Sequence, residues 1–172
     1  MEYNKNPIGV FDSGVGGVSV LSELISVMPN EDFLYFGDSY NAPYGTKSND
    51  EILKLSQACT KKLLDMGAKN VILTGVTFEE DKLGAAYMGQ DRKAEYYFQP
   101  RLPGTYHGTG DVFASSFCGA VLNGFSLYDS MGIAVRYVCD CIKRTQSMDT
   151  PITYGVDFER GIPYYIKELG KI

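Results

Sequence analysis

The sequence predicts an α/β protein, a three-layer α/β/α sandwich whose mixed, mostly parallel sheet carries an antiparallel hairpin at its edge. Three observations support this class. Short apolar runs at residues 8–11, 32–36 and 70–74 alternate with segments of helical periodicity, as in βα units. The first run leads through a glycine-rich turn into a helix. Two later runs, 83–88 and 93–99, are separated by a turn typical of a hairpin.

The first βα unit covers residues 8–28. Its strand is followed by DSGVGG, residues 12–17, and then by apolar positions at helical spacing up to Met28. Ligands of open α/β sheets bind at the carboxyl ends of the strands, so this turn is a candidate binding loop. Its glycines are only a weak phosphate-loop signal, because neither a Lys-Ser/Thr pair nor dinucleotide spacing accompanies them.

The middle of the chain repeats the pattern. Pro29 and Asn30 end the first helix, and residues 32–38 form the second strand. An amphipathic helix is expected at 49–66, with Gly67 suited to its C-terminal cap. The strand at 70–74 follows, and we expect the three parallel strands in the order 2-1-3.

The C-terminal part is mainly helical. A helix is predicted at residues 111–123, and residues 124–126 break it. Ser126 is a good N-cap for a long helix that ends near Thr145. A last short helix is expected at 161–169.

Composition narrows the function classes. The 172 residues carry a net charge of −5 and no basic run, which argues against a nucleic-acid partner. No apolar run approaches the roughly 20 residues that span a bilayer, so we expect no membrane partner and a cytoplasmic protein. The four cysteines show no zinc spacing and are expected to be reduced, with no metal site. One merged domain over residues 1–172 is expected.

The motif that most clearly indicates a chemical function is PGTYHGTGD, residues 103–111, which lies directly before a helix. Gly108, Thr109 and Gly110 would leave backbone N–H groups free at the helix start, where the helix dipole favours an anion. Asp111 is placed to take a proton from a hydroxyl that attacks a phosphate held there. A plain glycine turn with Asp111 as a capping acid is the alternative.

The longer stretch, PGTYHGTGDVFASSFCGAVLNGFSLYDSMGIAV, resembles the pyridoxal and pyridoxamine kinases of the ribokinase superfamily, and the likeness covers about residues 69–172. The resemblance implies that residues 108–110 form the anion hole and that Asp111 is the catalytic base. It also implies ATP with Mg²⁺ as cofactors, and a pyridoxal-type small molecule as substrate. Thr74 and Gly75 would bind the nucleotide.

The same resemblance suggests an adenine slot, although the residues concerned fit equally well in a core. These residues are Val112, Phe113, Ile133 and Val135. Kinases of this superfamily are often dimers, and the edge strands at 83–99 could pair, so a homodimer is a further expectation.

The N-terminal part resembles a second family. IGVFDSGVGG and DFLYFGDSYNAPYGTKS look like the start of glutamate racemase, over about residues 8–66. The resemblance implies that a small-ligand remnant persists, formed by Asp12, Ser13, Pro43, Tyr44 and Gly45.

The racemase resemblance breaks where catalysis requires a thiol. Gly75 stands in the position of the first catalytic cysteine, and no later segment resembles the second. Racemization without a cofactor needs two thiols on opposite faces of the α-carbon, so racemase activity is not expected.

The chain therefore reads as a chimera of a racemase-like segment, residues 1–66, and a ribokinase-like segment, residues 67–172. The half of a kinase that holds the vitamin is missing, so we expect phosphoryl transfer to be impaired or absent, and whether the chain is an enzyme stays open. Two alternatives remain: a natural or engineered chimera that folds but catalyses nothing, and a residual amino-acid binder.

Overall fold

A computed structural model describes residues 8–12, 17–27, 29–30, 32–148 and 155–171. By its internal contacts the chain divides into two compact units, Met1–Ala68 and Lys69–Ile172. The expected single merged domain stays a prediction.

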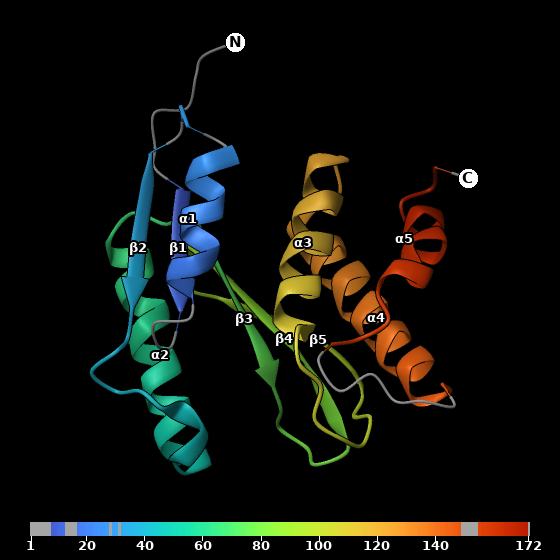
Figure 1. Ribbon diagram of the computed structural model, residues 1–172. Helices are drawn as coiled ribbons and strands as arrows, with labels where there is room; N and C mark the ends of the chain where they lie inside the picture. The colour runs from blue at the N-terminus through green and yellow to red at the C-terminus, as the bar shows by residue number, and fades with distance from the viewer. Residues whose placement is uncertain (1–7, 13–16, 28, 31, 149–154, 172) are drawn as a thin grey trace. The chain divides into compact units, whose positions relative to one another are not determined.

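The N-terminal unit is built from one βαβ unit and a long helix (Figure 1). Strands β1 (Ile8–Asp12) and β2 (Phe33–Gly37) pair in parallel, with helix α1 (Gly17–Val27) between them in sequence. This pairing confirms the expected first two strands. The predicted loop residues 13–16 lie outside the described residues.

A short 3₁₀ turn, η1 (Tyr44–Thr46), leads into helix α2 (Asn49–Asp65). Helix α2 starts with a capping box, in which Ser48 accepts a hydrogen bond from the N–H of Glu51 and the Glu51 carboxylate accepts one from the N–H of Ser48. Gly67 follows the helix with φ at +105°, a conformation that favours glycine. The predicted start and end of this helix are confirmed to within one residue.

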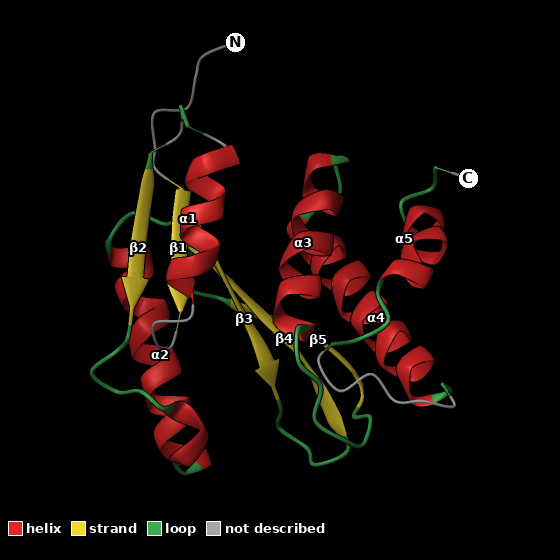
Figure 2. Ribbon diagram, viewed as in Figure 1, coloured by secondary structure: helices red, strands yellow, loops and turns green. Residues whose placement is uncertain are grey.

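The C-terminal unit contains a three-stranded sheet, coloured yellow in Figure 2. Its strands are β3 (Asn70–Val76), β4 (Lys82–Gly89) and β5 (Ala94–Pro100), in the order β3-β4-β5. Both pairings are antiparallel, and the β4–β5 hairpin confirms the expected antiparallel edge.

The described strands pair within each unit, as β1-β2 and β3-β4-β5. The expected order 2-1-3 would place β1 beside β3, which belong to different units, and it stays a prediction. The antiparallel pairing of β3 with β4 follows from the short connection at residues 77–81, because only an antiparallel pair can be joined so briefly. The Thr77 hydroxyl stabilises this connection by donating to the carbonyls of Glu79 and Lys82.

Three helices follow the sheet: α3 (Thr109–Leu122), α4 (Leu127–Gln146) and α5 (Ile162–Glu168), with a 3₁₀ turn η2 (Glu159–Gly161) before α5. Helix α4 packs on β4 and β5 and also contacts α3 and α5. Its predicted N-cap is confirmed, since the Ser126 hydroxyl accepts from the N–H of Asp129 at 3.1 Å. Helix α4 is therefore the element to which the others attach.

Small residues allow α4 to lie close to the sheet. Ala85 on β4 and Ala134 on α4 are fully buried, next to Met131 and Phe113. A Cβ at Gly132 would lie only 3.0 Å from the ring of Tyr97 on β5. This core fixes α3 and α4 relative to the sheet and so places the start of α3. No helix in the described part of the chain is long and apolar enough to cross a membrane.

Candidate functional site: an open helix start beside a cavity

The start of helix α3 is not capped by a side chain. Gly108 is its N-cap residue, with φ at +76°, a left-handed conformation that glycine adopts without strain. The first N–H that closes the helix belongs to Val112, which donates to the Gly108 carbonyl at 3.0 Å. The N–H groups of Thr109, Gly110 and Asp111 have no acceptor within the helix and can be offered to a ligand.

Two glycines keep this helix start accessible. A Cβ atom added at Gly108 or at Gly110 would meet no atom within 4 Å. Gly108 is required by its backbone angle, but no packing contact and no unusual φ requires glycine at position 110. Glycine in a helix costs about 1 kcal/mol relative to alanine. The open space at Gly110 therefore fits a group that approaches the backbone closely.

The loop before this helix is tied to α4. The Tyr106 hydroxyl donates to the Pro103 carbonyl at 2.8 Å, and the Gln146 side-chain amide donates to both of these oxygens. Gly104, with φ at +104°, makes the turn between them. The predicted PGTYH segment is thus held at the C-terminal end of α4, which fixes the direction from which the chain enters α3.

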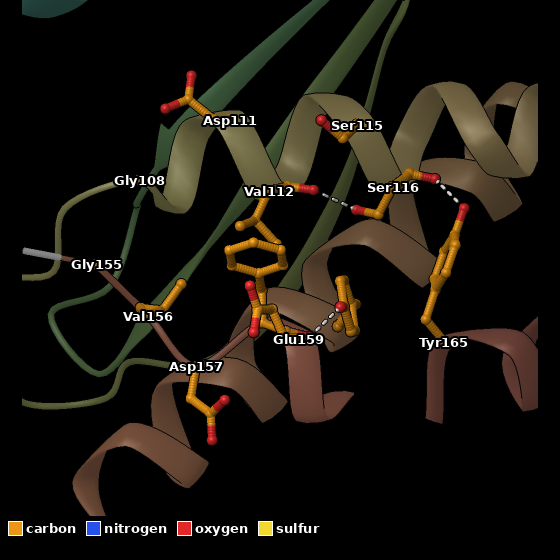
Figure 3. A pocket seen from close by; sticks show the side chains of 12 residues that line it. Gly108, Asp111, Val112, Ser115, Ser116, Gly155, Val156, Asp157, Glu159 and Tyr165 are labelled. Atoms are coloured by element: carbon orange, nitrogen blue, oxygen red, sulfur yellow. Dashed lines mark hydrogen bonds between the residues drawn. The ribbon is translucent and has the colours of Figure 1, made fainter. Parts of the chain in front are cut away.

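A cavity of about 570 Å³ opens beside the start of α3. Figure 3 shows one wall formed by α3, an opposite wall formed by residues 155–159, and Tyr165 of α5 at one end. Helix α4 contributes Tyr137. The α3 wall consists of Asp111, Val112, Ser115 and Ser116, which follow Gly108.

The charges around the cavity are unevenly distributed. Its ionisable carboxyl groups are those of Asp111, Asp157 and Glu159, and no Lys or Arg is among the described lining residues. Carboxylates repel phosphate, so the positively polarised helix start is the part of this site that suits an anion. The interior beyond it suits an uncharged group.

Two tyrosines, Tyr137 and Tyr165, are among the residues that line the cavity. The Tyr165 hydroxyl donates to the carbonyl of Ser116 at 2.7 Å, and burial raises the pKa of Tyr165. Burial also raises the pKa of Tyr137 to about 12. Both hydroxyls therefore remain protonated donors at neutral pH.

The structure brings Asp111 and the glycine turn together, as the sequence indicated. Asp111 lies in the first turn of α3, and its carboxylate is exposed and labelled at the top of Figure 3, away from Val156 and Asp157. The anion-hole and base roles remain predictions. Of the four residues suggested for an adenine slot, Val112 lines the cavity, whereas Phe113, Ile133 and Val135 are buried, as the alternative of a plain core requires.

Thr74 and Gly75 occupy a β-bulge. The register of β3 against β4 shifts between Thr74 and Val76, and Gly75 has φ at +73° with nothing within 4 Å of an added Cβ. Both residues are exposed, and neither is among the residues that line the cavity. Their nucleotide-binding role stays a prediction.

The predicted small-ligand residues belong to the N-terminal unit. Asp12 ends β1, and its carbonyl accepts from the N–H of Asp38 at 3.0 Å. Pro43 follows Ala42 through a cis peptide bond, and Gly45 is the middle residue of η1. Ser13 lies outside the described residues.

Sequence reasoning missed the partner of Tyr44. Its hydroxyl donates to Asp38 Oδ2 at 2.6 Å, and the Asn41 amide donates to both oxygens of the same carboxylate. The Tyr44 hydrogen bond is the main reason that the pKa of Asp38 is lowered, whereas burial raises the pKa of the nearby Cys59 thiol. The signal was in the sequence, since Asp38 directly follows the β2 strand.

The cavity wall at 155–159 was also missed in the sequence, because no hydrophobic periodicity indicates it.

The described residues contain no group of three or more His, Cys, Asp or Glu side chains placed to hold a metal ion. The cysteines are free, and Cys139 and Cys141 both lie on α4.

Comparison with known proteins assigns the family. A family model described as phosphomethylpyrimidine kinase matches residues 46–154. The chain belongs to the phosphomethylpyrimidine kinase family. The family match begins before helix α2, earlier than the residue near 69 at which the sequence suggested the kinase likeness to start.

Solved structures of pyridoxal kinases share the fold of this chain. Pyridoxal kinase from Lactobacillus plantarum is 26% identical with a TM-score of 0.55, covering 75% of this chain and 45% of that one. Pyridoxal kinase from Entamoeba histolytica is 16% identical with a TM-score of 0.59, covering 93% and 69%. Pyridoxal kinase from Leishmania donovani, in complex with ADP and pyridoxine, is 19% identical with a TM-score of 0.52, covering 72% and 41%. The predicted three-layer α/β class agrees with these neighbours.

Part of this chain is also similar to curated glutamate racemases. Glutamate racemase from Clostridium novyi is 59% identical over 73 residues, which are 42% of this chain and 28% of the racemase. Glutamate racemase from Campylobacter curvus is 54% identical over 66 residues, 38% of this chain and 25% of the racemase. The chain thus spans about a quarter of the length of these curated relatives. Both predicted resemblances are confirmed.

Proposed function

We propose that this chain is a chimera whose kinase-like part binds Mg-ATP, with the phosphates at the start of α3 and the nucleoside in the adjacent cavity. The observation that carries the proposal is the open, uncapped helix start, where glycine at position 110 serves no packing purpose. Free N–H groups and the helix dipole favour phosphate there.

The size and chemistry of the cavity support the nucleoside part of this proposal. Its volume of about 570 Å³ lies within the range of small-molecule sites. Its lining includes apolar side chains, tyrosine rings and carboxylates, which suit an uncharged base and a ribose better than a phosphate. Mg²⁺ would come with the phosphates, because it is usually held by one or two carboxylates together with substrate phosphate oxygens.

Asp111 is the proposed base. A carboxylate within one helical turn of the phosphate site can accept the proton of an attacking hydroxyl. The hydroxyl donor would be a pyridoxal-type molecule, by analogy with the kinases that share the fold. Transfer is expected to be weak or absent, because Asp111 is exposed and water can therefore reach the group that is transferred.

The racemase-like segment is proposed as a structural remnant with at most a weak amino-acid site. Tyr44, the residue that would contact such a ligand, already donates its hydroxyl to Asp38. The free cysteines and the use of ATP fit a cytoplasmic protein. A homodimer through the hairpin edge stays a prediction.

Titration calorimetry of the whole chain with Mg-ATP tests the proposal. We expect saturable binding near one ATP per chain, and no heat of binding from glutamate at the same concentrations. Absence of any Mg-ATP binding by a protein that melts cooperatively would contradict the proposal and favour a folded chimera without a site. Glutamate binding without ATP binding would favour the residual amino-acid binder.

A further inference from the structure

The cavity wall opposite α3 has little regular structure of its own. Residues 155–158, which we call the wall segment, form neither helix nor strand, and η2 follows them. We infer that Tyr137, Arg144 and Thr145 of α4 are positioning residues that hold the wall segment and thereby set the affinity for the nucleoside half of the ligand. This inference rests on the function proposed above.

Thr145 fixes the wall segment at Asp157. The Thr145 side chain is 3% exposed, and its hydroxyl oxygen accepts from the N–H of Asp157 at 2.8 Å. The same hydroxyl donates to the carbonyl of Cys141, one turn earlier in α4, at 2.8 Å. A hydroxyl that donates and accepts at once can take only one rotamer, so the backbone at Asp157 is held in one place.

Tyr137 fixes Phe158, the residue after Asp157 in the wall segment. Its hydroxyl donates to the carbonyl of Phe158 at 2.7 Å, and its ring packs against Tyr165 with 5.1 Å between ring centroids. Because its pKa is raised to about 12, the hydroxyl remains a donor at every pH at which the protein would be assayed.

Arg144 holds the segment from a third point. Its Nε donates to the carbonyl of Asp157 at 3.2 Å and lies 3.8 Å from the Asp157 carboxylate. A second ion pair joins its Nη1 to Asp140. A Cβ at Gly161 would overlap the guanidinium group of Arg144, so glycine there leaves room for this side chain.

These three residues act from one face of α4. Positions 144 and 145 lie two turns after position 137, and side chains at that spacing project from the same side of a helix. Together they bond the backbone of two consecutive wall residues, Asp157 and Phe158, of which only Phe158 is also held by η2, through the N–H of Gly161. The geometry of this wall therefore depends on side chains of α4.

The helix start and the wall segment are held by different hydrogen bonds, although Tyr106 and Val112 pack in one apolar cluster with Tyr137 and Val156. Tyr137→Phe keeps the ring in this cluster and removes only the hydrogen bond to the wall segment. The loop before α3 is tied by Gln146 and Tyr106, not by the three positioning residues. Loosening the wall should therefore weaken contacts with the nucleoside and leave those with the phosphates intact. A purely structural role would instead lower stability and affect both halves of the ligand alike.

Tyr137→Phe tests this inference, with Mg-ATP and inorganic tripolyphosphate as separate probes of the whole chain. Loss of one hydrogen bond of about 1 kcal/mol should weaken Mg-ATP binding about fivefold while tripolyphosphate binding stays unchanged. Thr145→Val is expected to act in the same direction. Tyr87→Phe is the matched control, because its hydroxyl donates to Asn70, away from the cavity, and its loss should change neither affinity.

The outcomes separate this inference from the proposed function. If the unmodified chain binds Mg-ATP and Tyr137→Phe leaves that affinity unchanged, the inference is wrong and the proposed function stands. An equal loss for both probes would also overturn it, since the hydroxyl would then be merely structural. No binding of Mg-ATP by the unmodified chain would overturn the proposed function itself.

Discussion

Replacing Gly110 with leucine is expected to reduce the affinity for Mg-ATP by about 100-fold or more without destabilising the protein. The loss corresponds to one or two charge-assisted hydrogen bonds between phosphate and backbone N–H groups. A leucine side chain would fill the open space over these groups, yet its Cβ would meet no protein atom within 4 Å. Leucine is also the better helix former, so the melting temperature should stay the same or rise.

Titration calorimetry and thermal melting of the same sample measure both effects. Cys118→Leu is the matched control, because position 118 is exposed on the same helix and does not line the cavity. That variant should bind Mg-ATP as the unmodified chain does. A Gly110→Leu protein that binds Mg-ATP with unchanged affinity would show that the phosphates do not lie at this helix start.

Replacing Asp111 with asparagine should separate binding from transfer. Removal of a general base typically slows a reaction by about 10²- to 10⁴-fold, so any phosphoryl transfer from ATP to pyridoxal or to water should fall by that order. The affinity for Mg-ATP should rise at the same time, because a negative charge within one helical turn of the proposed phosphate site is removed. The rise in affinity can be measured even if turnover is too slow to detect.

Asp129→Asn is the control for this experiment. Asp129 is also an exposed acid in the first turn of a helix, α4, but it does not line the cavity. Its replacement should alter neither the affinity for Mg-ATP nor the rate. Equal turnover by the Asp111→Asn and unmodified proteins would refute the base assignment, and a weaker affinity would refute its position beside the phosphates.

Much of the local structure could be predicted from the sequence because local interactions determine it. The helix from Asn49 is fixed by its capping box, and the helix from Leu127 by the Ser126 cap. The hairpin of β4 and β5 follows from a short turn, in which Arg92 has φ at +58°. In each case the residues that decide the outcome are close together in sequence.

The strand pairing could be predicted only where the strands are close together in the sequence. Strand β4 follows β3 after only five residues, so closing that loop costs little entropy, and the two strands pair antiparallel. The parallel neighbour expected for β3 comes from much earlier in the chain, and hydrophobic patterning does not identify a partner at that distance.

The candidate site was predictable in part. The glycines and Asp111 form a compact motif, so their place at the start of α3 follows from the sequence. The opposite cavity wall depends on contacts between residues 12 to 21 positions apart, such as Thr145 with Asp157 and Tyr137 with Phe158. Side-chain bonds to irregular backbone leave no periodic signal. The Tyr44–Asp38 contact was missed although only six positions separate the two residues, because an acid directly after a strand indicates a candidate site without identifying the residue that bonds it.

The central claim is that the phosphates bind at the start of α3, and backbone amide chemical shifts test it most directly. During titration of the isotopically labelled chain with Mg-ATP, the N–H signals of Thr109, Gly110 and Asp111 should shift with one saturation curve. The signals of Asn49 and Asp50 should not move, since Ser48 and Glu51 already cap their helix. Saturable binding that shifts other amides and leaves those three unchanged would contradict the account.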